Sequence, residues 1–301
     1  MDVRQGFVMS ELSLAGRGAI ITGGSVGLGY AIAEAYVRHG ANVMICARTA
    51  TEVTAARNRL ARLTKPRQVV AAMPADVSTE ADIDKIVSTA LATFPGLEIL
   101  VNNAAIVGPI GPAEDADWQK WRHTTEVNLF GSVLMCRAVV PHFRRQKYGK
   151  ILQLSAGGAT APDPRFSAYA ASKAAAVAFA ATLAEELRDD SIDVNSIAPG
   201  GLTTRMNDEK LAAGTEKLGD VLYQQLRKRK KEGGTPLAFG AELAVFLGAA
   251  ASDGITGRII SAVWDEWRTL ADHRDKLSDS DVYTLRRVVP RDRGFSWSAD
   301  S

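Results

Sequence analysis

Residues 18–29 read Gly-Ala-Ile-Ile-Thr-Gly-Gly-Ser-Val-Gly-Leu-Gly, and this stretch decides the fold. The apolar run at its start predicts a short buried strand, and residues 30–39 after it predict a helix. Between the two, Gly23, Gly27 and Gly29 follow the spacing G-x-x-x-G-x-G. Glycine lets the backbone approach a pyrophosphate closely, and the free N–H groups at a helix start bind anions. The order of strand, glycine-rich turn and helix therefore indicates a dinucleotide-binding turn, with a tight turn that holds no ligand as the alternative.

Short apolar runs alternate with helical stretches along the rest of the chain. We expect strands at 17–22, 42–47, 68–73, 97–102, 149–154, 192–197 and 258–262. We expect helices at 27–39, 50–63, 79–93, 115–146, 167–188, 207–231 and 239–250. This alternation predicts an α/β fold with a doubly wound, parallel, seven-stranded sheet of the Rossmann type and helices on both faces. Ligands of such sheets bind at the carboxyl ends of the strands.

The composition argues against several classes of protein. The 301 residues are 46% hydrophobic and 23% charged, which is ordinary for a globular protein. A net charge of +2 gives no general reason to expect binding to nucleic acid or to an anionic membrane. No apolar run approaches the ~20 residues of a membrane span, and the first residues lack the apolar core of a signal peptide.

The cysteines indicate the compartment. Only Cys46 and Cys136 are present, both in apolar surroundings, so we expect buried, reduced thiols rather than a disulfide or a metal site. No cluster of histidines and cysteines has metal-binding spacing, so no metal is expected. These observations predict a cytoplasmic protein.

The run from Ser167 to Lys173 carries the strongest chemical signal. It places Tyr169 and Lys173 four residues apart on a predicted helix, so the two side chains share one face. A neighbouring cation favours phenolate, so we expect the pKa of Tyr169 to fall from about 10 towards working pH. Such a phenol suits general acid–base chemistry on an alcohol or a carbonyl group. Alone, the pair would more often be an ordinary helix face, and the glycine-rich turn is what favours a catalytic interpretation.

Together, the glycine-rich turn and the Tyr169–Lys173 pair resemble the short-chain dehydrogenase/reductase family, in its compact single-domain branch. The resemblance runs from about Leu14 to Val263, and its parts occur in the expected order. The matching motifs are Thr22 to Gly29, Asp76 in Ala75-Asp76-Val77, Asn102-Asn103-Ala104-Ala105, Asn128 in Val127-Asn128-Leu129, Ser155 at the end of Ile151 to Ser155, Tyr169 with Lys173, and Pro199-Gly200 followed by Thr203. Two details depart from the usual pattern: Ala105 replaces a commoner glycine, and the interval from Ser155 to Tyr169 is about one residue longer.

The resemblance implies a catalytic set of Asn128, Ser155, Tyr169 and Lys173. Tyr169 would exchange a proton with the substrate oxygen, and Ser155 would hydrogen-bond that oxygen. Lys173 would lower the pKa of Tyr169 and bind the nicotinamide ribose, and Asn128 would hold a water that links Lys173 to solvent. The implied cofactor contacts are Gly23, Ser25, Val26, Gly27, Leu28, Gly29, Arg48, Asp76, Val77, Asn103, Ala104, Tyr169, Lys173, Pro199, Gly200, Leu202 and Thr203.

The end of the second predicted strand indicates which cofactor is preferred. It reads Ala47-Arg48, without the acid that would accept hydrogen bonds from the ribose hydroxyls. A guanidinium can hold a 2′-phosphate with two hydrogen bonds, and the resemblance links arginine at this position with NADP preference. Val26 stands where many NADP users carry a second basic residue. We expect preference for NADP(H), with use of NAD(H) and a merely structural Arg48 as the alternatives.

We expect one domain with a flanking segment at each end. Residues 1–11 are predicted to be a disordered N-terminal arm, 12–263 a dinucleotide-binding catalytic domain, and 264–301 a C-terminal extension. The family places its substrate lid near 202–236, where spaced apolar residues predict an amphipathic helix. The basic run 227–231 is expected to be the solvated end of that helix, with binding of an anionic substrate tail or of nucleic acid as the alternative.

The extension is rich in aromatic residues and arginine, which is typical of interfaces. We expect it to pack over the substrate cleft or on a neighbouring subunit. The alternative is disorder beyond about Asp292.

The resemblance as a whole predicts an NADP(H)-dependent oxidoreductase. The enzyme would transfer hydride between the nicotinamide and a secondary alcohol or ketone of small size, and would form a homodimer or homotetramer. A 3-oxoacyl thioester reductase is the main rival within the redox class. A non-redox enzyme such as an epimerase would need a larger substrate domain than 202–236 provides. A non-catalytic, cofactor-sensing protein is disfavoured because binding alone needs no tuned tyrosine.

Overall fold

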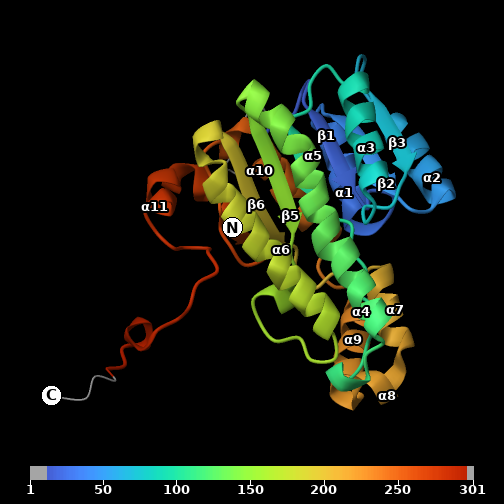
Figure 1. Cartoon of the computed structure of the whole chain (residues 1–301), viewed down its shortest axis with the longest axis vertical. Helices are drawn as coiled ribbons and strands as arrows, with labels where there is room; N and C mark the ends of the chain where they lie inside the picture. Colours follow the sequence, from blue (N-terminus) through green and yellow to red (C-terminus); the bar gives the residue numbers. More distant parts are fainter. Residues whose placement is uncertain (1–11, 297–301) are drawn as a thin grey trace.

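The computed structural model describes residues 12–296, so the predicted arm at 1–11 and the last residues of the extension lie outside the described chain. Seven parallel strands form one sheet in the order β3-β2-β1-β4-β5-β6-β7 (Figure 1). The strands are β1 (Gly18–Thr22), β2 (Asn42–Ala47), β3 (Val70–Pro74), β4 (Ile99–Asn102), β5 (Gly149–Leu154), β6 (Ile192–Ala198) and β7 (Ile259–Ser261). This order confirms the predicted doubly wound fold. Strands β2 and β3 are added on one side of β1, and β4 to β7 are added on its other side.

Helices cover both faces of the sheet and bury a separate apolar cluster on each. One face carries α1 (Gly27–Arg38), α2 (Ala50–Ala61) and α10 (Leu237–Gly248). The other carries α3 (Glu80–Thr93), α5 (Gly131–Gln146) and α6 (Ser167–Glu186). Short 3-10 turns lie at η1 (Ala113–Asp115), η3 (Gly157–Ala159), η4 (Arg188–Asp190) and η5 (Ala250–Ser252). The near-continuous apolar runs of the strands follow from this double cover.

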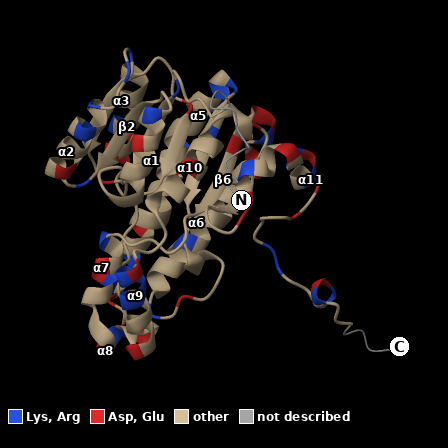
Figure 2. Cartoon of the chain, turned by 180° about the vertical axis from the view of Figure 1, so that it is seen from behind, with Lys and Arg blue, Asp and Glu red and all other residues tan. Residues whose placement is uncertain are grey.

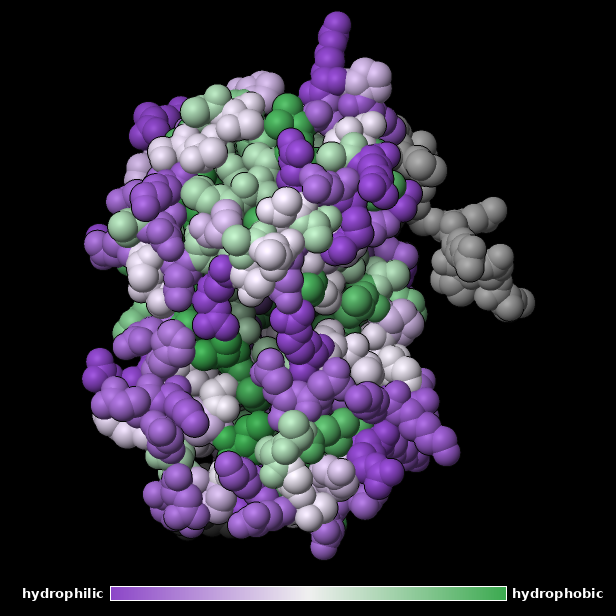
Figure 3. Space-filling model, turned by 90° about the vertical axis from the view of Figure 1, so that its right-hand side faces the viewer, coloured by the Kyte–Doolittle hydropathy of each residue, from purple (hydrophilic) through white to green (hydrophobic). Residues whose placement is uncertain are grey.

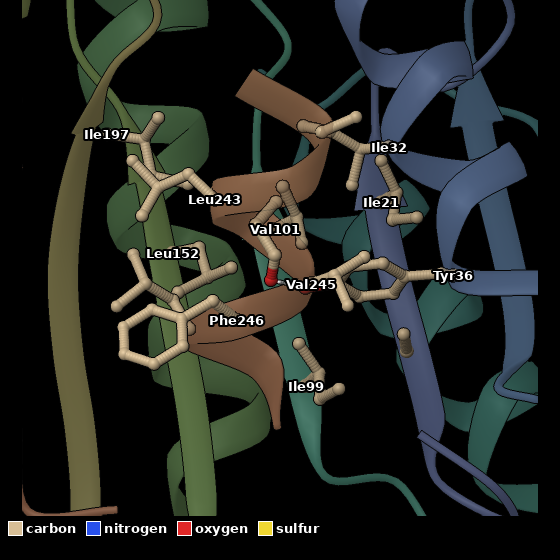
Figure 4. Packing of buried hydrophobic residues seen from close by; sticks show 14 of the residues in the cluster. Ile21, Ile32, Tyr36, Ile99, Val101, Leu152, Ile197, Leu243, Val245 and Phe246 are labelled. Carbon is tan, nitrogen blue, oxygen red and sulfur yellow. Dashed lines mark hydrogen bonds between the residues drawn. The ribbon is translucent and has the colours of Figure 1, made fainter. Parts of the chain in front are cut away.

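The α1–α10 face shows how the core is held together. Ile21, Val101 and Leu152 from neighbouring strands meet side chains of the two helices (Figure 4). Tyr36 of α1 is fully buried, and its hydroxyl donates a 2.8 Å hydrogen bond to the carbonyl of Ala244 in α10. The phenol therefore adds apolar area to the core without leaving a polar atom unsatisfied.

The helix expected at 115–146 is one continuous run with a π-helical turn inside it. It consists of α4 (Trp118–Thr125), the π turn η2 (Glu126–Phe130) and α5. Asp117 caps its start by accepting a 3.0 Å hydrogen bond from the N–H of Lys120. Single π turns inside α-helices occur frequently at functional sites, and this one carries Asn128.

The prediction of a single helix at 207–231 is wrong. The structure has three short helices there, α7 (Arg205–Ala212), α8 (Gly214–Leu218) and α9 (Asp220–Glu232). Gly214 and Gly219 break the run because both have positive φ, +74° and +76°. The apolar residues of the segment still pack inward, on a third cluster that includes Phe166 and Tyr169. Figure 1 shows α7–α9 gathered at one end of the molecule, away from the sheet.

The C-terminal extension is fixed to the body at its beginning. It contains η6 (Trp267–His273), α11 (Arg274–Ser278) and η7 (Pro290–Arg293). Trp267 is buried against Phe246 of α10, with ring centroids 5.6 Å apart. The N–H of Ile259 in β7 donates to the carbonyl of Tyr283 at 2.7 Å. Beyond this bond the chain leads away from the body (Figure 1) and exposes apolar residues such as Val288.

Two expectations about the whole chain concern cysteines and membranes. Cys46 and Cys136 are free and buried, as predicted, and burial raises the pKa of each thiol to about 12. Within residues 12–296, no helix has the length and apolarity that crossing a bilayer would require.

Candidate active site

A cavity of about 440 Å³ lies at the carboxyl ends of the strands. Every predicted cofactor contact lines this cavity except Gly200, which lines the neighbouring one, and Thr203. Thr203 lines neither cavity, and the next residue, Thr204, lines both. Figure 3 views the molecule from the side of α2 and shows apolar side chains reaching the surface in its lower half, where the α7–α9 end meets the sheet domain.

The glycine-rich turn is shaped to receive an anion. Gly23 has a φ of +64°, and a Cβ on Gly29 would lie 2.3 Å from the carbonyl oxygen of Gly23. The two glycines therefore allow a close approach of backbone that a side chain would prevent. No side chain caps the start of α1, and its first turn holds no acid. Its free N–H groups thus suit a pyrophosphate, so these residues fit a dinucleotide.

Asn103 holds the turn in place. Its amide nitrogen donates to the carbonyls of Thr22 (2.9 Å) and Gly23 (3.1 Å). Its backbone N–H also bonds the Thr22 hydroxyl at 3.0 Å. These bonds fix the end of β4 to the end of β1. Asn103 therefore holds the glycine-rich turn in position and also lines the cavity.

The far end of this cavity carries Asp76 and Arg48. Partial burial alone would raise the pKa of the Asp76 carboxyl, but two hydrogen bonds from Ser78 outweigh it, and Arg48 and His123 add to their effect, so the pKa lies below its ordinary value. Asp76 is therefore an ionised acceptor. Arg48 is exposed on the wall, at the end of β2.

Sequence reasoning missed an ion pair on the same wall. Arg205 of α7 bonds Glu52 of α2 with an N–O distance of 2.7 Å, and both residues line the cavity. The two lie 153 positions apart, so no local pattern could have paired them. The pair connects the α7–α9 segment to the Arg48 end of the cavity.

Three of the four catalytic candidates meet at the inner end of the cavity. Ser155 follows β5, and Tyr169 and Lys173 project from α6. Tyr169 is 8% exposed and Lys173 is 2% exposed. Lys173 donates a 2.8 Å hydrogen bond to the carbonyl of Leu154, and burial lowers its pKa to about 8.

The prediction that the pKa of Tyr169 falls is wrong. Burial raises the pKa of this phenol to about 12, and the charge of Asp163 adds to the increase. The ammonium of Lys173 lies 6.0 Å from the centre of the Tyr169 ring and faces Leu154, so it does not offset the loss of solvent. In the absence of ligand, Tyr169 is a protonated phenol, which is the form that donates a proton.

Asn128 lies behind the other three and lines neither cavity. Its side chain is fully buried, accepts from the N–H of Ile106 (2.9 Å), and donates to the Ile106 carbonyl (3.0 Å) and the Ser172 hydroxyl (3.0 Å). Both amide hydrogens are thus used by protein atoms. The side chain braces α6 against the loop after β4.

A second cavity of about 830 Å³ adjoins the first and shares Ser155 and Tyr169 with it. Its wall includes Asn207 and Lys210 from α7, which sequence reasoning had not singled out, and Arg229 from α9, which belongs to the basic run 227–231. Tyr283 and Thr284 of the extension also line it, so this part of the extension lies beside the second cavity. Within residues 12–296, no group of three or more potential metal ligands comes together.

Arg258 fixes the extension and offers a direct test of its attachment. The side chain is 6% exposed and donates to the carbonyls of Leu277, Ser280 (2.9 Å) and Val282 (2.8 Å). We expect Arg258→Met to loosen residues 279–296, because the three carbonyls lose their charged donor, and to cost about 1–3 kcal/mol of stability. Amide hydrogen exchange and limited proteolysis should both become faster in this segment. Arg145→Met, at an exposed arginine of α5, is the control. Unchanged exchange in Arg258→Met would show that Arg258 does not hold the extension in place.

Comparisons with known proteins agree with the geometry. Residues 17–214 match the family profile described as short chain dehydrogenase. The chain is 37% identical over 216 residues to 3beta-hydroxysteroid dehydrogenase 1 of Eggerthella lenta, covering 70% of this chain and 82% of that protein. It is 30% identical over 237 residues to L-fucose dehydrogenase of Mus musculus, covering 79% of this chain and 84% of that protein.

A solved structure extends the comparison to the fold. L-sorbose reductase from Gluconobacter frateurii, complexed with NADPH and L-sorbose, superposes with a TM-score of 0.74 at 28% identity. The match covers 83% of this chain and 96% of that one.

Proposed function

The chain belongs to the short-chain dehydrogenase/reductase family and is an oxidoreductase that acts on hydroxyl or keto groups, and on this premise we propose that it is an NADP(H)-dependent enzyme interconverting a secondary alcohol and a ketone. The observation that carries the proposal is the junction of the two cavities at Ser155 and Tyr169. A cofactor in the first cavity and a substrate in the second would meet at these two side chains.

The first cavity offers complementary groups to each part of NADP(H). The N–H groups of the glycine-rich turn and α1 suit the pyrophosphate, and Arg48 suits the 2′-phosphate. Asp76 suits the adenine amine, and Lys173 suits the ribose beside the nicotinamide. When bound, the cofactor supplies or accepts the hydride, and the protein supplies position and charge.

Tyr169 and Ser155 act on the substrate oxygen in this proposal. During reduction Tyr169 donates its proton to the oxygen, and the Ser155 hydroxyl donates a hydrogen bond as negative charge develops there. During oxidation Tyr169 accepts the proton as a phenolate. Lys173 assists in this proposal by turning from the Leu154 carbonyl towards the phenolate, and its pKa of about 8 lets it release a proton near neutral pH. Asn128 keeps α6 in register with the loop after β4.

Cofactor preference rests on Arg48 and gives a prediction. We expect Arg48→Ala to weaken NADPH binding by about 10- to 100-fold, because one charged, bidentate partner of the phosphate is lost, and to leave NADH binding within about threefold. Calorimetric titration of both cofactors measures the change. Arg62→Ala, at an arginine on the far end of α2 that lines neither cavity, is the control. Equal losses for NADH and NADPH would show that Arg48 does not read the phosphate.

Several broader features belong to the same proposal. We take the α7–α9 segment as the substrate lid, and we place the enzyme in the cytoplasm as a homodimer or homotetramer. The relatives act on a steroid, on L-fucose and on L-sorbose by name, a range that defines the substrate only as a small alcohol or carbonyl compound. Met206 and Lys210 support the lid, because both line the second cavity. The free thiols support the cytoplasm, and the apolar residues exposed after Thr284 support an oligomer.

The test is turnover of NADPH with a panel of carbonyl compounds. The panel contains ketoses, steroid ketones, short oxo acids and a 3-oxoacyl thioester, and products are identified as the corresponding alcohols. We expect at least one small ketone to be reduced, and the thioester to be a poor substrate. Preference for the thioester would favour the rival reductase. Stoichiometric NADPH binding without turnover of any compound would favour a cofactor-sensing protein.

A further inference from the structure

The substrate cavity has an unpaired cation beside the proton donor. Lys210 projects from α7 over the rings of Phe166 and Tyr169, with its ammonium 4.3 Å and 5.1 Å from their centres. Within residues 12–296 the ammonium makes no ion pair and no hydrogen bond to a side chain, although burial lowers its pKa. A largely desolvated ammonium without an anionic partner is costly, and such a cost is commonly maintained at sites that bind an anion.

A second group on the same helix face also lacks a partner. Asn207 lies three residues before Lys210, so the two side chains are neighbours on α7. The residue is 5% exposed, and its amide nitrogen is buried without a hydrogen-bond partner in the described chain. Asn207 and Lys210 both line the second cavity. Two donors, one neutral and one charged, therefore lack an acceptor at the same wall.

The other charged side chains of the wall leave Lys210 without an ion-pair partner. Arg229 of α9 lines the same cavity and lies near Gly201, and Figure 2 shows several lysines and arginines on α9 and charges of both signs on α7. Asp265 also lines this cavity, and its carboxylate accepts a 2.6 Å hydrogen bond from the N–H of Ser261. Asp163 is the opposing charge, since it acts on both Lys210 and Tyr169, yet it stays outside ion-pair distance of Lys210. The two cations and the two carboxylates of this wall balance in number, but neither carboxylate forms an ion pair with Lys210.

We propose that Lys210, with Asn207 beside it, binds a carboxylate of the substrate, so that the enzyme acts on short oxo acids and hydroxy acids. The inference rests on the proposed oxidoreductase function and names the substrate class for the same site. The reacting carbonyl must approach the Tyr169 hydroxyl within about 2.6–3.2 Å. Because Lys210 lies over the same ring, a carboxylate that reaches it is only a few bonds from the reacting carbon. Lys210 is thereby a specificity-determining residue.

The experiment compares acids with their neutral esters. The probes are acetoacetate against methyl acetoacetate and levulinate against methyl levulinate, each with NADPH. We expect the wild-type enzyme to prefer the acids by about 10- to 100-fold in kcat/KM, which is the effect of one charge-assisted hydrogen bond. Lys210→Met should lose this factor for the acids while the esters change less than about threefold. Lys210→Arg should restore most of the preference.

Controls separate the role of Lys210 from packing and from the function itself. Lys217→Met, at an exposed lysine on α8 that lines neither cavity, should behave as the wild type. The NADPH dissociation constant should be unchanged in Lys210→Met, because Lys210 lies outside the cofactor cavity. Equal turnover of acids and esters by the wild type, or equal losses of both in Lys210→Met, would overturn the inference while the oxidoreductase function stands. Absence of any carbonyl reduction would overturn both.

Discussion

Replacing Tyr169 by phenylalanine is expected to lower kcat by about 100- to 10,000-fold, which is the range that one positioned general acid contributes. The ring remains, so its packing against the cluster with Phe166 and Val107 is retained. Only the hydroxyl that lies where the two cavities join is lost. The NADPH dissociation constant should therefore stay within about twofold of the wild-type value. Single-turnover kinetics with excess enzyme would separate the chemical step from product release.

Tyr223→Phe is the matched control for this change. Tyr223 is a partly buried tyrosine of the same apolar cluster and lines neither cavity, so its hydroxyl should be dispensable. The pH profile adds a second measurement. Because the pKa of Tyr169 is about 12, carbonyl reduction should change little through the neutral range, whereas alcohol oxidation, which needs the phenolate, should rise with pH. Full activity in Tyr169→Phe would end its assignment as the acid.

The largest effect on stability is expected at Lys150, far from the cavities. Lys150 is 1% exposed and lies directly across from Asp193 in the β5–β6 pairing. Its ammonium contacts the carboxylates of Asp193 at 2.6 Å and Asp253 at 2.7 Å. Lys150→Met should cost about 3–5 kcal/mol near neutral pH, because it leaves the buried Asp193 carboxylate without its cation. Chemical denaturation of the two proteins measures the difference.

A double variant and the pH dependence identify the cause. In Lys150→Met/Asp193→Leu no buried charge remains, so most of the lost stability should return. Burial already raises the pKa of Asp193, and without Lys150 this pKa should rise further. A carboxyl pKa that is raised in the folded state destabilises the fold fully above that pKa, less as the pH falls below it, and not at all below the unfolded-state pKa. The deficit of Lys150→Met should therefore shrink as the pH falls. A deficit that is independent of pH and persists in the double variant would point to packing instead.

The sequence was sufficient for features that depend on local pattern. The strand, glycine turn and helix at 18–38 and the four-residue spacing of Tyr169 and Lys173 are local, and the structure has both as expected. The same reasoning failed at 207–231, where apolar spacing indicated one helix. A glycine inside a helix costs only about 1 kcal/mol, so the sequence could not tell a tolerated glycine from the breaks at Gly214 and Gly219.

The missed parts of the site depend on residues that are distant in sequence. The Glu52–Arg205 ion pair and the position of Lys210 over Tyr169 exist only because the tertiary fold brings α7 against residues of α2 and α6. The predicted direction of the Tyr169 pKa shift was wrong for a similar reason. Helical spacing indicated a cation nearby, but burial and the charge of Asp163 dominate, and neither can be judged from spacing. The attachment of the extension through Arg258 likewise joins segments on opposite sides of η6 and α11.

Direct transfer of hydride is the central claim, and isotope labelling tests it most directly. NADPH deuterated on the transferring face of the nicotinamide would be incubated with the protein and the carbonyl compound that it reduces fastest, and the alcohol analysed by mass spectrometry. The account predicts one deuterium on the carbinol carbon of every product molecule, and loss of product formation in Tyr169→Phe. A product whose new hydrogen comes from solvent, or no reduction of any carbonyl compound, would contradict it.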